Sequence, residues 1–134
     1  MPITKSAMQL VDDAMARIRT RTVDESRALV DDPSVTFVDL RDPREIEREG
    51  MIPGAFSATR GMLEFWVDPA SPYYKPIFGE EDRQFVLYCG GGWRSALATA
   101  TVQDMGMTNV SHVEGGFAAW KKAGAPTAAK SAKS

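Results

Sequence analysis

Residues 85–106, FVLYCGGGWRSALATATVQDMG, constrain the fold more than any other part of this chain of 134 residues. The first five of them are apolar and favour β-structure, which predicts a buried strand. Three glycines end that strand. Residues 94–105 are then rich in Ala and Leu and predict a helix, which Gly106 terminates. A strand that leads directly into a helix is the repeating unit of an α/β fold.

The rest of the chain repeats this alternation. Residues 35–40, VTFVDL, are dense in β-branched and apolar side chains, which is typical of a strand buried on both faces in a parallel sheet. A helix is expected next, capped by Asp42, with Pro43 at its first position and Glu45 at its third, and Gly50 ends it. A further strand is expected at residues 109–113. The pattern predicts a three-layer α/β domain around a parallel sheet.

The two ends of the chain differ from its centre. Residues 6–19 carry apolar side chains at helical spacing, so we interpret residues 1–21 as a helical extension packed on the domain. The last ten residues contain only Ala, Pro, Thr, Lys and Ser. Such a composition cannot bury enough apolar surface to offset the entropy of ordering, so residues 127–134 are expected to be a disordered tail. Residues 22–126 then form the main domain.

Composition limits the partners and the compartment. The chain has 16 basic and 18 acidic residues and a pI near 5.4, which gives no footprint for nucleic acid or an anionic membrane surface. A single cysteine fits a reducing compartment, and the first residues do not resemble a signal peptide, so a cytoplasmic location is expected. One Cys and one His cannot form a usual zinc site. We expect no metal, no cofactor, and a monomer or weak homodimer.

Cys89 stands where an open α/β sheet places its ligand crevice, at the carboxyl end of a strand and just before a helix. The following glycines let the backbone curl, and amide N–H groups at the start of the helix can converge on one point. An anion is stabilised there, so the thiolate is favoured over the thiol and the cysteine becomes a nucleophile. The plainer alternative is a glycine-rich turn with an incidental buried cysteine.

Three motifs carry a resemblance to a known family. The spacing C-x4-R in CGGGWR resembles the six-residue active-site loop of the rhodanese superfamily. VDLRDPREIEREGMIPGAF is similar to that family's D-x-R, acidic helix and G-H-I-P-G-A segment, and EGGFAAWKKAGAP is similar to its G-G-x-x-x-W-x-x-x-G-x-P ending. Together the motifs cover about residues 22–126. The resemblance implies a central, mostly parallel five-stranded sheet flanked by helices and a rhodanese-like catalytic domain.

The resemblance assigns roles to individual residues. It makes Cys89 the catalytic sulfur acceptor and Asp39 a supporting residue. Arg41 is expected either to contact substrate or to form a structural salt bridge, and Arg60 either to reach the pocket or to remain at the surface. His112 is expected to be a satisfied imidazole and not a general base. The residues expected to bind substrate are Gly90, Gly91, Gly92, Trp93, Arg94, Ser95, Arg41 and Arg60.

The implied activity is that of a sulfurtransferase. Cys89 would take a sulfane sulfur from thiosulfate or a persulfide, hold it as a persulfide, and yield it to an external thiol or to cyanide. The loop of this chain is less cationic than that of some family members, and Met51 stands where the family usually has histidine. Thiosulfate is therefore expected to be a poor donor, and an uncharged or protein-borne persulfide becomes the alternative.

Two other functions remain open. A phosphatase or arsenate reductase would use a cysteine and an arginine on a similar anion cradle, but those relatives resemble C-x5-R, one residue longer than the spacing from Cys89 to Arg94. A non-catalytic binding or regulatory module would keep the fold without the chemistry, and the retained cysteine argues against it.

Overall fold

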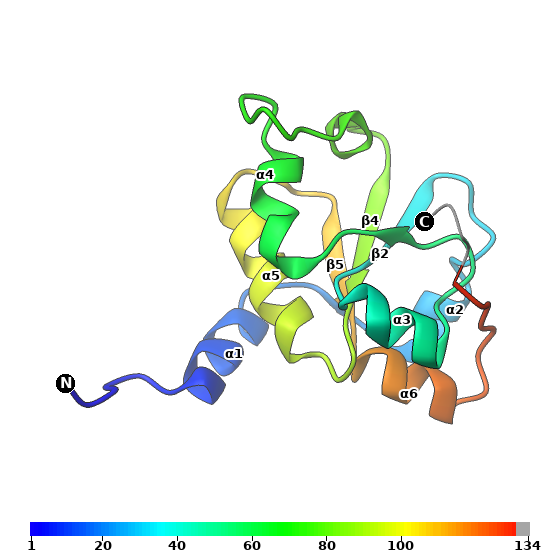
Figure 1. The fold of residues 1–134 in the computed structure, drawn as a ribbon, viewed down its shortest axis with the longest axis horizontal. Coiled ribbons are helices and arrows are strands. Elements are labelled where there is room, and N and C mark those ends of the chain that lie inside the picture. Colours follow the sequence, from blue (N-terminus) through cyan, green and yellow to red (C-terminus); the bar gives the residue numbers. More distant parts are fainter. Residues whose placement is uncertain (131–134) are drawn as a thin grey trace.

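Five parallel strands form the central sheet of residues 1–130, the part of the chain that the computed structural model describes. Their order across the sheet is β1-β5-β4-β2-β3 (Figure 1). The predicted α/β class with a parallel five-stranded sheet is confirmed. The strands are β1 (Thr20–Arg21), β2 (Val35–Asp39), β3 (Phe56–Ser57), β4 (Gln84–Tyr88) and β5 (Val110–Val113).

Helices connect the strands and cover both faces of the sheet. The α3 helix begins as the sequence predicts, with a capping box between Asp42 and Glu45 and with Pro43 in its first turn. The α-helices are α1 (Ala7–Met15), α2 (Val23–Arg27), α3 (Pro43–Glu49), α4 (Leu63–Val67), α5 (Trp93–Asp104) and α6 (Gly116–Lys122). Two 3-10 helices, η1 (Arg60–Met62) and η2 (Pro76–Gly79), flank α4.

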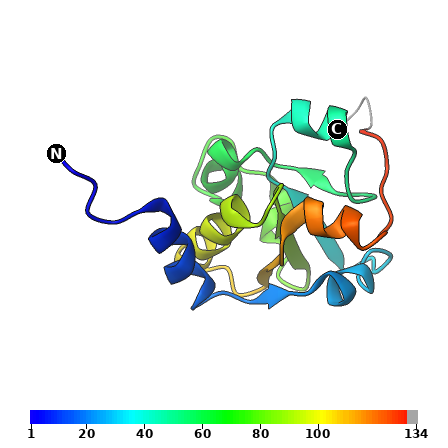
Figure 2. The ribbon, with the colours of Figure 1, turned by 90° about the horizontal axis from the view of Figure 1, so that it is seen from below.

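Alternating side chains on β4 build the two halves of the core. Phe85 and Leu87 belong to the same apolar cluster as side chains of α4 and α5, and Cys89 continues that row. Val86 and Tyr88 belong to the opposite cluster, which includes side chains of α3 and α6. Figure 2 shows the sheet between these helices. The alternation directs the cysteine side chain toward the α5 side.

The sheet begins earlier than the sequence analysis predicts. The α1 helix does pack on the domain, because Val11 and Ala14 are buried against Ala96 and Ala100 of α5. However, β1 lies within the segment interpreted as a helical extension, and it pairs with β5 as an edge strand. Two residues are too short to show an alternating pattern, so only the tertiary pairing reveals this strand.

The carboxyl-terminal segment remains bonded to the domain beyond residue 126, further along the chain than expected. Ala128 pairs with Met51 through two backbone hydrogen bonds of 2.8 Å, although the segment from residue 127 was expected to be disordered. The part of that expectation that concerns residues 131–134 lies outside the described residues. Within residues 1–130, none of the helices combines the length and apolar character required to cross a membrane.

Candidate active site

The sulfur of Cys89 lies at the amino end of α5 and is held by backbone donors. Its Sγ accepts N–H hydrogen bonds from Gly92 at 3.1 Å and from Ser95 at 3.3 Å. The side chain is 1% exposed. Gly92 has a φ of +100°, a conformation that side chains rarely adopt, so glycine is required where the loop turns into the helix. Donors and helix dipole together favour a sulfur anion at this point.

The start of α6 supports the same loop from behind. The N–H of Phe117 donates to the carbonyl of Cys89 at 2.8 Å, and the N–H of Ala118 donates to the carbonyl of Gly90 at 3.0 Å. A Cβ on Gly116 would lie 2.6 Å from the Cys89 carbonyl oxygen. The G-G pair of the carboxyl-terminal motif therefore permits a close backbone contact that fixes the loop.

Arg94 is turned toward α3. Its guanidinium donates two hydrogen bonds to Glu45, at 2.8 and 3.0 Å, and forms an ion pair with it. The hydrogen bond from Arg94 is the main cause that lowers the pKa of Glu45 to about 2. Much of the charge that Arg94 would present to an anionic ligand is thus offset by this carboxylate.

Asp39 and Arg41 form a buried pair beside the loop. Arg41 is 1% exposed and donates to both carboxylate oxygens of Asp39, at 3.0 and 2.8 Å, and to the Gly50 carbonyl at 2.7 Å. The Tyr88 hydroxyl also donates to Asp39, at 2.6 Å. Burial raises the pKa of Tyr88 far above its usual value. The guanidinium of Arg41 is thus enclosed and already bonded, which favours the structural salt bridge over a substrate contact.

Gly91 and Trp93 are the exposed members of the expected set, whereas Gly90, Arg94 and Arg60 are partly exposed. Arg60 pairs with Glu64 at 2.7 Å and lies at the wall of a cavity of about 490 Å³ between α1 and α5. Trp93 is 63% exposed at the first position of α5. Its ring is free to meet a partner that approaches the cysteine loop.

Sequence reasoning did not connect three residues with the cysteine loop. Glu45 could be seen only as part of a capping box, and Gly116 only as part of a structural motif. His112 is buried, and its Nδ1 lies 2.9 Å from the Ser95 hydroxyl. Strand alternation places Val110 and His112 on one face of β5, but no sequence signal shows that this face meets the cysteine loop.

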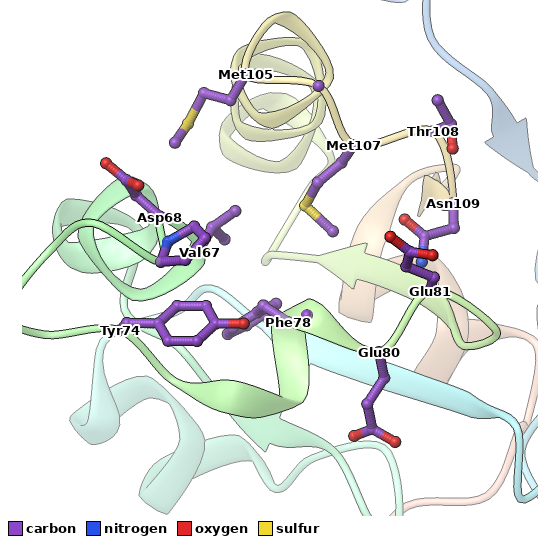
Figure 3. A pocket seen from close by; sticks show the side chains of 13 residues that line it. Val67, Asp68, Tyr74, Phe78, Glu80, Glu81, Met105, Met107, Thr108 and Asn109 are labelled. Carbon is purple, nitrogen blue, oxygen red and sulfur yellow. The ribbon is translucent and has the colours of Figure 1, made fainter.

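A larger cavity, of about 610 Å³, lies at the opposite end of the sheet. Its wall includes Phe78, Glu81, Met107 and Asn109, which lie near the amino ends of β4 and β5 (Figure 3). None of residues 89–95 contributes to it. Among residues 1–130 no group of three or more His, Cys, Asp and Glu side chains is arranged to hold a metal ion.

The rhodanese-like domain family matches this chain over residues 22–123. A sulfurtransferase from Allochromatium vinosum is 33% identical over 104 residues, covering 78% of this chain and 88% of that protein. A tRNA uridine(34) hydroxylase from Erwinia tasmaniensis is 34% identical over 97 residues, covering 69% of this chain. The match spans 25% of the hydroxylase, so it concerns one part of a longer protein.

Solved structures share the fold. A protein of unknown function from Rhodopseudomonas palustris, described as a possible tyrosine phosphatase, is 55% identical with a TM-score of 0.91, covering 96% of this chain and 98% of that one. A thiosulfate sulfurtransferase from Pseudomonas aeruginosa is 21% identical with a TM-score of 0.77, covering 93% of this chain and 23% of that one. At that identity the second likeness concerns the fold alone.

Proposed function

This chain belongs to the rhodanese-like domain family, and on that premise we propose that it is a sulfurtransferase in which Cys89 carries a persulfide. The observation that carries the proposal is the position of Sγ, which accepts two backbone N–H hydrogen bonds at the amino end of a helix. Those donors suit the thiolate that begins the reaction.

The reaction divides into two half-reactions. The thiolate of Cys89 attacks the sulfane sulfur of a donor, so an S–S bond forms at Cys89 while the donor's own bond to that sulfur breaks. An external thiol or cyanide then attacks the outer sulfur of the persulfide and removes it, which returns the Cys89 thiolate. The acceptor must be external because the chain has no second cysteine.

The charges around the loop favour a donor with little negative charge. Arg94 is the one cation of residues 89–95, and Glu45 pairs with it. Arg41 is paired with Asp39 and enclosed. Thiosulfate carries two negative charges and gains little from such a site, whereas a persulfide on a small thiol or on a protein needs less neutralisation. Exposed Trp93, in the same loop as Cys89, offers a protein donor an aromatic contact.

Mass spectrometry of the intact protein tests the proposal. The reduced protein is incubated separately with thiosulfate and with the persulfide of a small thiol, and a gain of one sulfur atom on Cys89 is expected. A Cys89→Ser variant should gain none, and wild-type protein loaded with sulfur should lose it on addition of cyanide. Absence of loading with both donors, together with hydrolysis of an aryl phosphate, would replace sulfur transfer by a phosphatase activity.

A further inference from the structure

A buried chain of hydrogen bonds runs from the cysteine to the edge of the sheet. Cys89 Sγ lies 3.6 Å from the Ser95 hydroxyl, which lies 2.9 Å from Nδ1 of His112. Nε2 of the same imidazole lies 3.0 Å from the hydroxyl of Thr20 on β1. Ser95 and His112 are 0% and 1% exposed, whereas Thr20 is partly exposed. This series of hydrogen bonds thus connects the enclosed sulfur of Cys89 with Thr20, which solvent can reach.

The imidazole in this chain is neutral. Burial lowers the pKa of His112 to about 4, so its protonated form is absent at neutral pH. A neutral imidazole has one nitrogen that donates and one that accepts. Each hydroxyl on either side can both donate and accept. All the hydrogen bonds from Thr20 to Cys89 can therefore donate toward the sulfur, or all can donate away from it. The tautomer of His112 shows which of these two directions is present.

We propose that Ser95, His112 and Thr20 form a reversible proton relay that serves Cys89. With a thiol, S–H donates to the Ser95 hydroxyl, Ser95 donates to Nδ1, and Nε2–H donates to Thr20. With a sulfur anion, Thr20 donates to Nε2, Nδ1–H donates to Ser95, and Ser95 donates to sulfur. The conversion moves one proton across each hydrogen bond and releases one from Thr20 to water, so the imidazole carries no charge in either state.

Reversal gives the sulfur a third donor, beside the N–H groups of Gly92 and Ser95. Without His112, the Ser95 hydroxyl has an alternative acceptor in the Gly92 carbonyl at 3.3 Å. The Nδ1–H group of His112 engages a lone pair of Ser95 and so turns its proton to the anion. In the thiol state, Thr20 can donate to Sδ of Met15 at 3.9 Å. His112 and Thr20 are positioning residues, since neither touches the sulfur.

The charged groups packed around the loop come from other elements. Arg94 is paired with Glu45 of α3, and Asp39 is paired with Arg41 beyond β2. Burial alone accounts for the low pKa of His112, so no charged partner fixes its tautomer. The charge on Cys89 is then what selects between the two directions. The inference rests on the proposed function, because it concerns the same sulfur.

Nitrogen-15 NMR of the imidazole reads the relay directly, because His112 is the only histidine of the chain. The reduced protein is titrated above pH 5, and the tautomer is expected to change from Nε2–H to Nδ1–H as Cys89 loses its proton. A Cys89→Ser variant, whose hydroxyl stays protonated, should retain Nε2–H throughout.

A second measurement follows alkylation of Cys89 by iodoacetamide against pH. Ser95→Ala is expected to raise the midpoint of the profile by about one pH unit and to slow alkylation at neutral pH about tenfold. Thr99→Val is the matched control, since Thr99 lies one turn along α5 and its buried hydroxyl has no hydrogen-bond partner within the described residues. Its profile should coincide with that of wild-type protein.

The outcomes separate this inference from the proposed function. One tautomer for both wild-type protein and Cys89→Ser at every pH, or an unchanged alkylation profile in Ser95→Ala, would overturn the relay even if sulfur loading succeeds. Both NMR and alkylation use the reduced protein and no donor. A tautomer change without sulfur loading would support the relay and contradict the sulfurtransferase.

Discussion

At the scale of single residues, the charge that the site presents to a ligand depends on which charged side chains are already paired with each other. Arg94 occupies the position that could neutralise an anionic donor, yet its guanidinium is engaged by two hydrogen bonds to Glu45. In the proposed sulfurtransferase, one carboxylate on a neighbouring helix would therefore influence which donor reacts without touching the sulfur. The residue to change is Glu45, because removal of Arg94 would disturb the loop itself.

A Glu45→Gln substitution tests this. Glutamine can still accept the Asp42 N–H hydrogen bond of the capping box. The positive charge of Arg94 is no longer offset, so kcat/KM for thiosulfate is expected to rise about three- to tenfold, with little change for a small persulfide donor. Glu47→Gln, at an exposed position of the same helix, is the control. Equal effects on both donors would refute the charge argument.

At the scale of secondary-structure elements, α6 acts as a clamp on the cysteine loop. Its first N–H groups bind the carbonyls of Cys89 and Gly90, and Gly116 has a φ of +62° with no room for a side chain. The loop is thereby held between the amino ends of two helices, α5 at its sulfur and α6 at its backbone.

Gly116→Ala should separate this clamp from the loop. A methyl group would clash with backbone atoms of residues 89 and 90, so a loss of about 2–4 kcal/mol in the free energy of unfolding is expected. Denaturant unfolding measures it. Gly106→Ala is a useful comparison, since Gly106 also has a positive φ but has open space around its Cα. A loss no greater than in that variant would show that backbone strain, not the clash, is responsible.

The docking of α1 on α5 allows another prediction. Val11 is 6% exposed in the small cluster between these helices, whereas the ion pair of Arg17 with Asp104 lies at the surface. Val11→Ala should destabilise the protein by about 1.5–3 kcal/mol. Arg17→Ala should change the free energy of unfolding far less than Val11→Ala does, because solvent screens its exposed ion pair. Equal losses in the two variants would mean that the ion pair, not apolar burial, secures the helix.

Local sequence patterns predict the helices and strands better than they predict the contacts between them. The strand–glycine–helix unit at residues 85–106 and the capping box of Asp42 are short-range signals, and both elements form as predicted. The bridge from Ala128 to Met51 and the pairing of β1 depend on contacts distant in sequence. The pairing of Arg94 with Glu45 and of Ser95 with His112 arises in the same way. The cysteine could thus be predicted, but its partners on other elements could not.

At the scale of the whole molecule, parallel strands bring the chemistry to one end. Cys89 lies beyond β4 and Asp39 ends β2, while the cavity around Phe78 lies at the other end. The polar groups gathered at the carboxyl end include a histidine that is buried and neutral in the folded state. This placement links global stability to pH.

Acid should destabilise the fold in two separate ranges of pH. The pKa of His112 falls from 6.5 to about 4 on burial, so only the unfolded chain takes up that proton between these values. Stability is therefore lost as pH falls from 6.5 to about 4, by about 3 kcal/mol. The pKa of Glu45, lowered from 4.5 to about 2 chiefly by Arg94, adds a loss only below 4.5.

Denaturant unfolding at a series of pH values measures the two ranges. A His112→Asn variant has no titrating group at that position and should lose the slope between pH 6.5 and 4 while it keeps the slope at lower pH. Glu45→Gln should do the reverse. An unchanged slope above pH 4 in His112→Asn would assign the sensitivity to other groups.

The enclosure of Cys89, which is 1% exposed, also bears on which atom of the proposed persulfide can react. In the proposed intermediate the inner sulfur keeps this shielded position, and the added sulfur stands where an acceptor can approach. Attack on the inner atom would expel hydrosulfide and leave a mixed disulfide, a dead end for a chain with one cysteine. In the proposed reaction, burial of the inner sulfur directs attack to the outer sulfur. The outer sulfur is then transferred to the acceptor and is not lost as hydrosulfide.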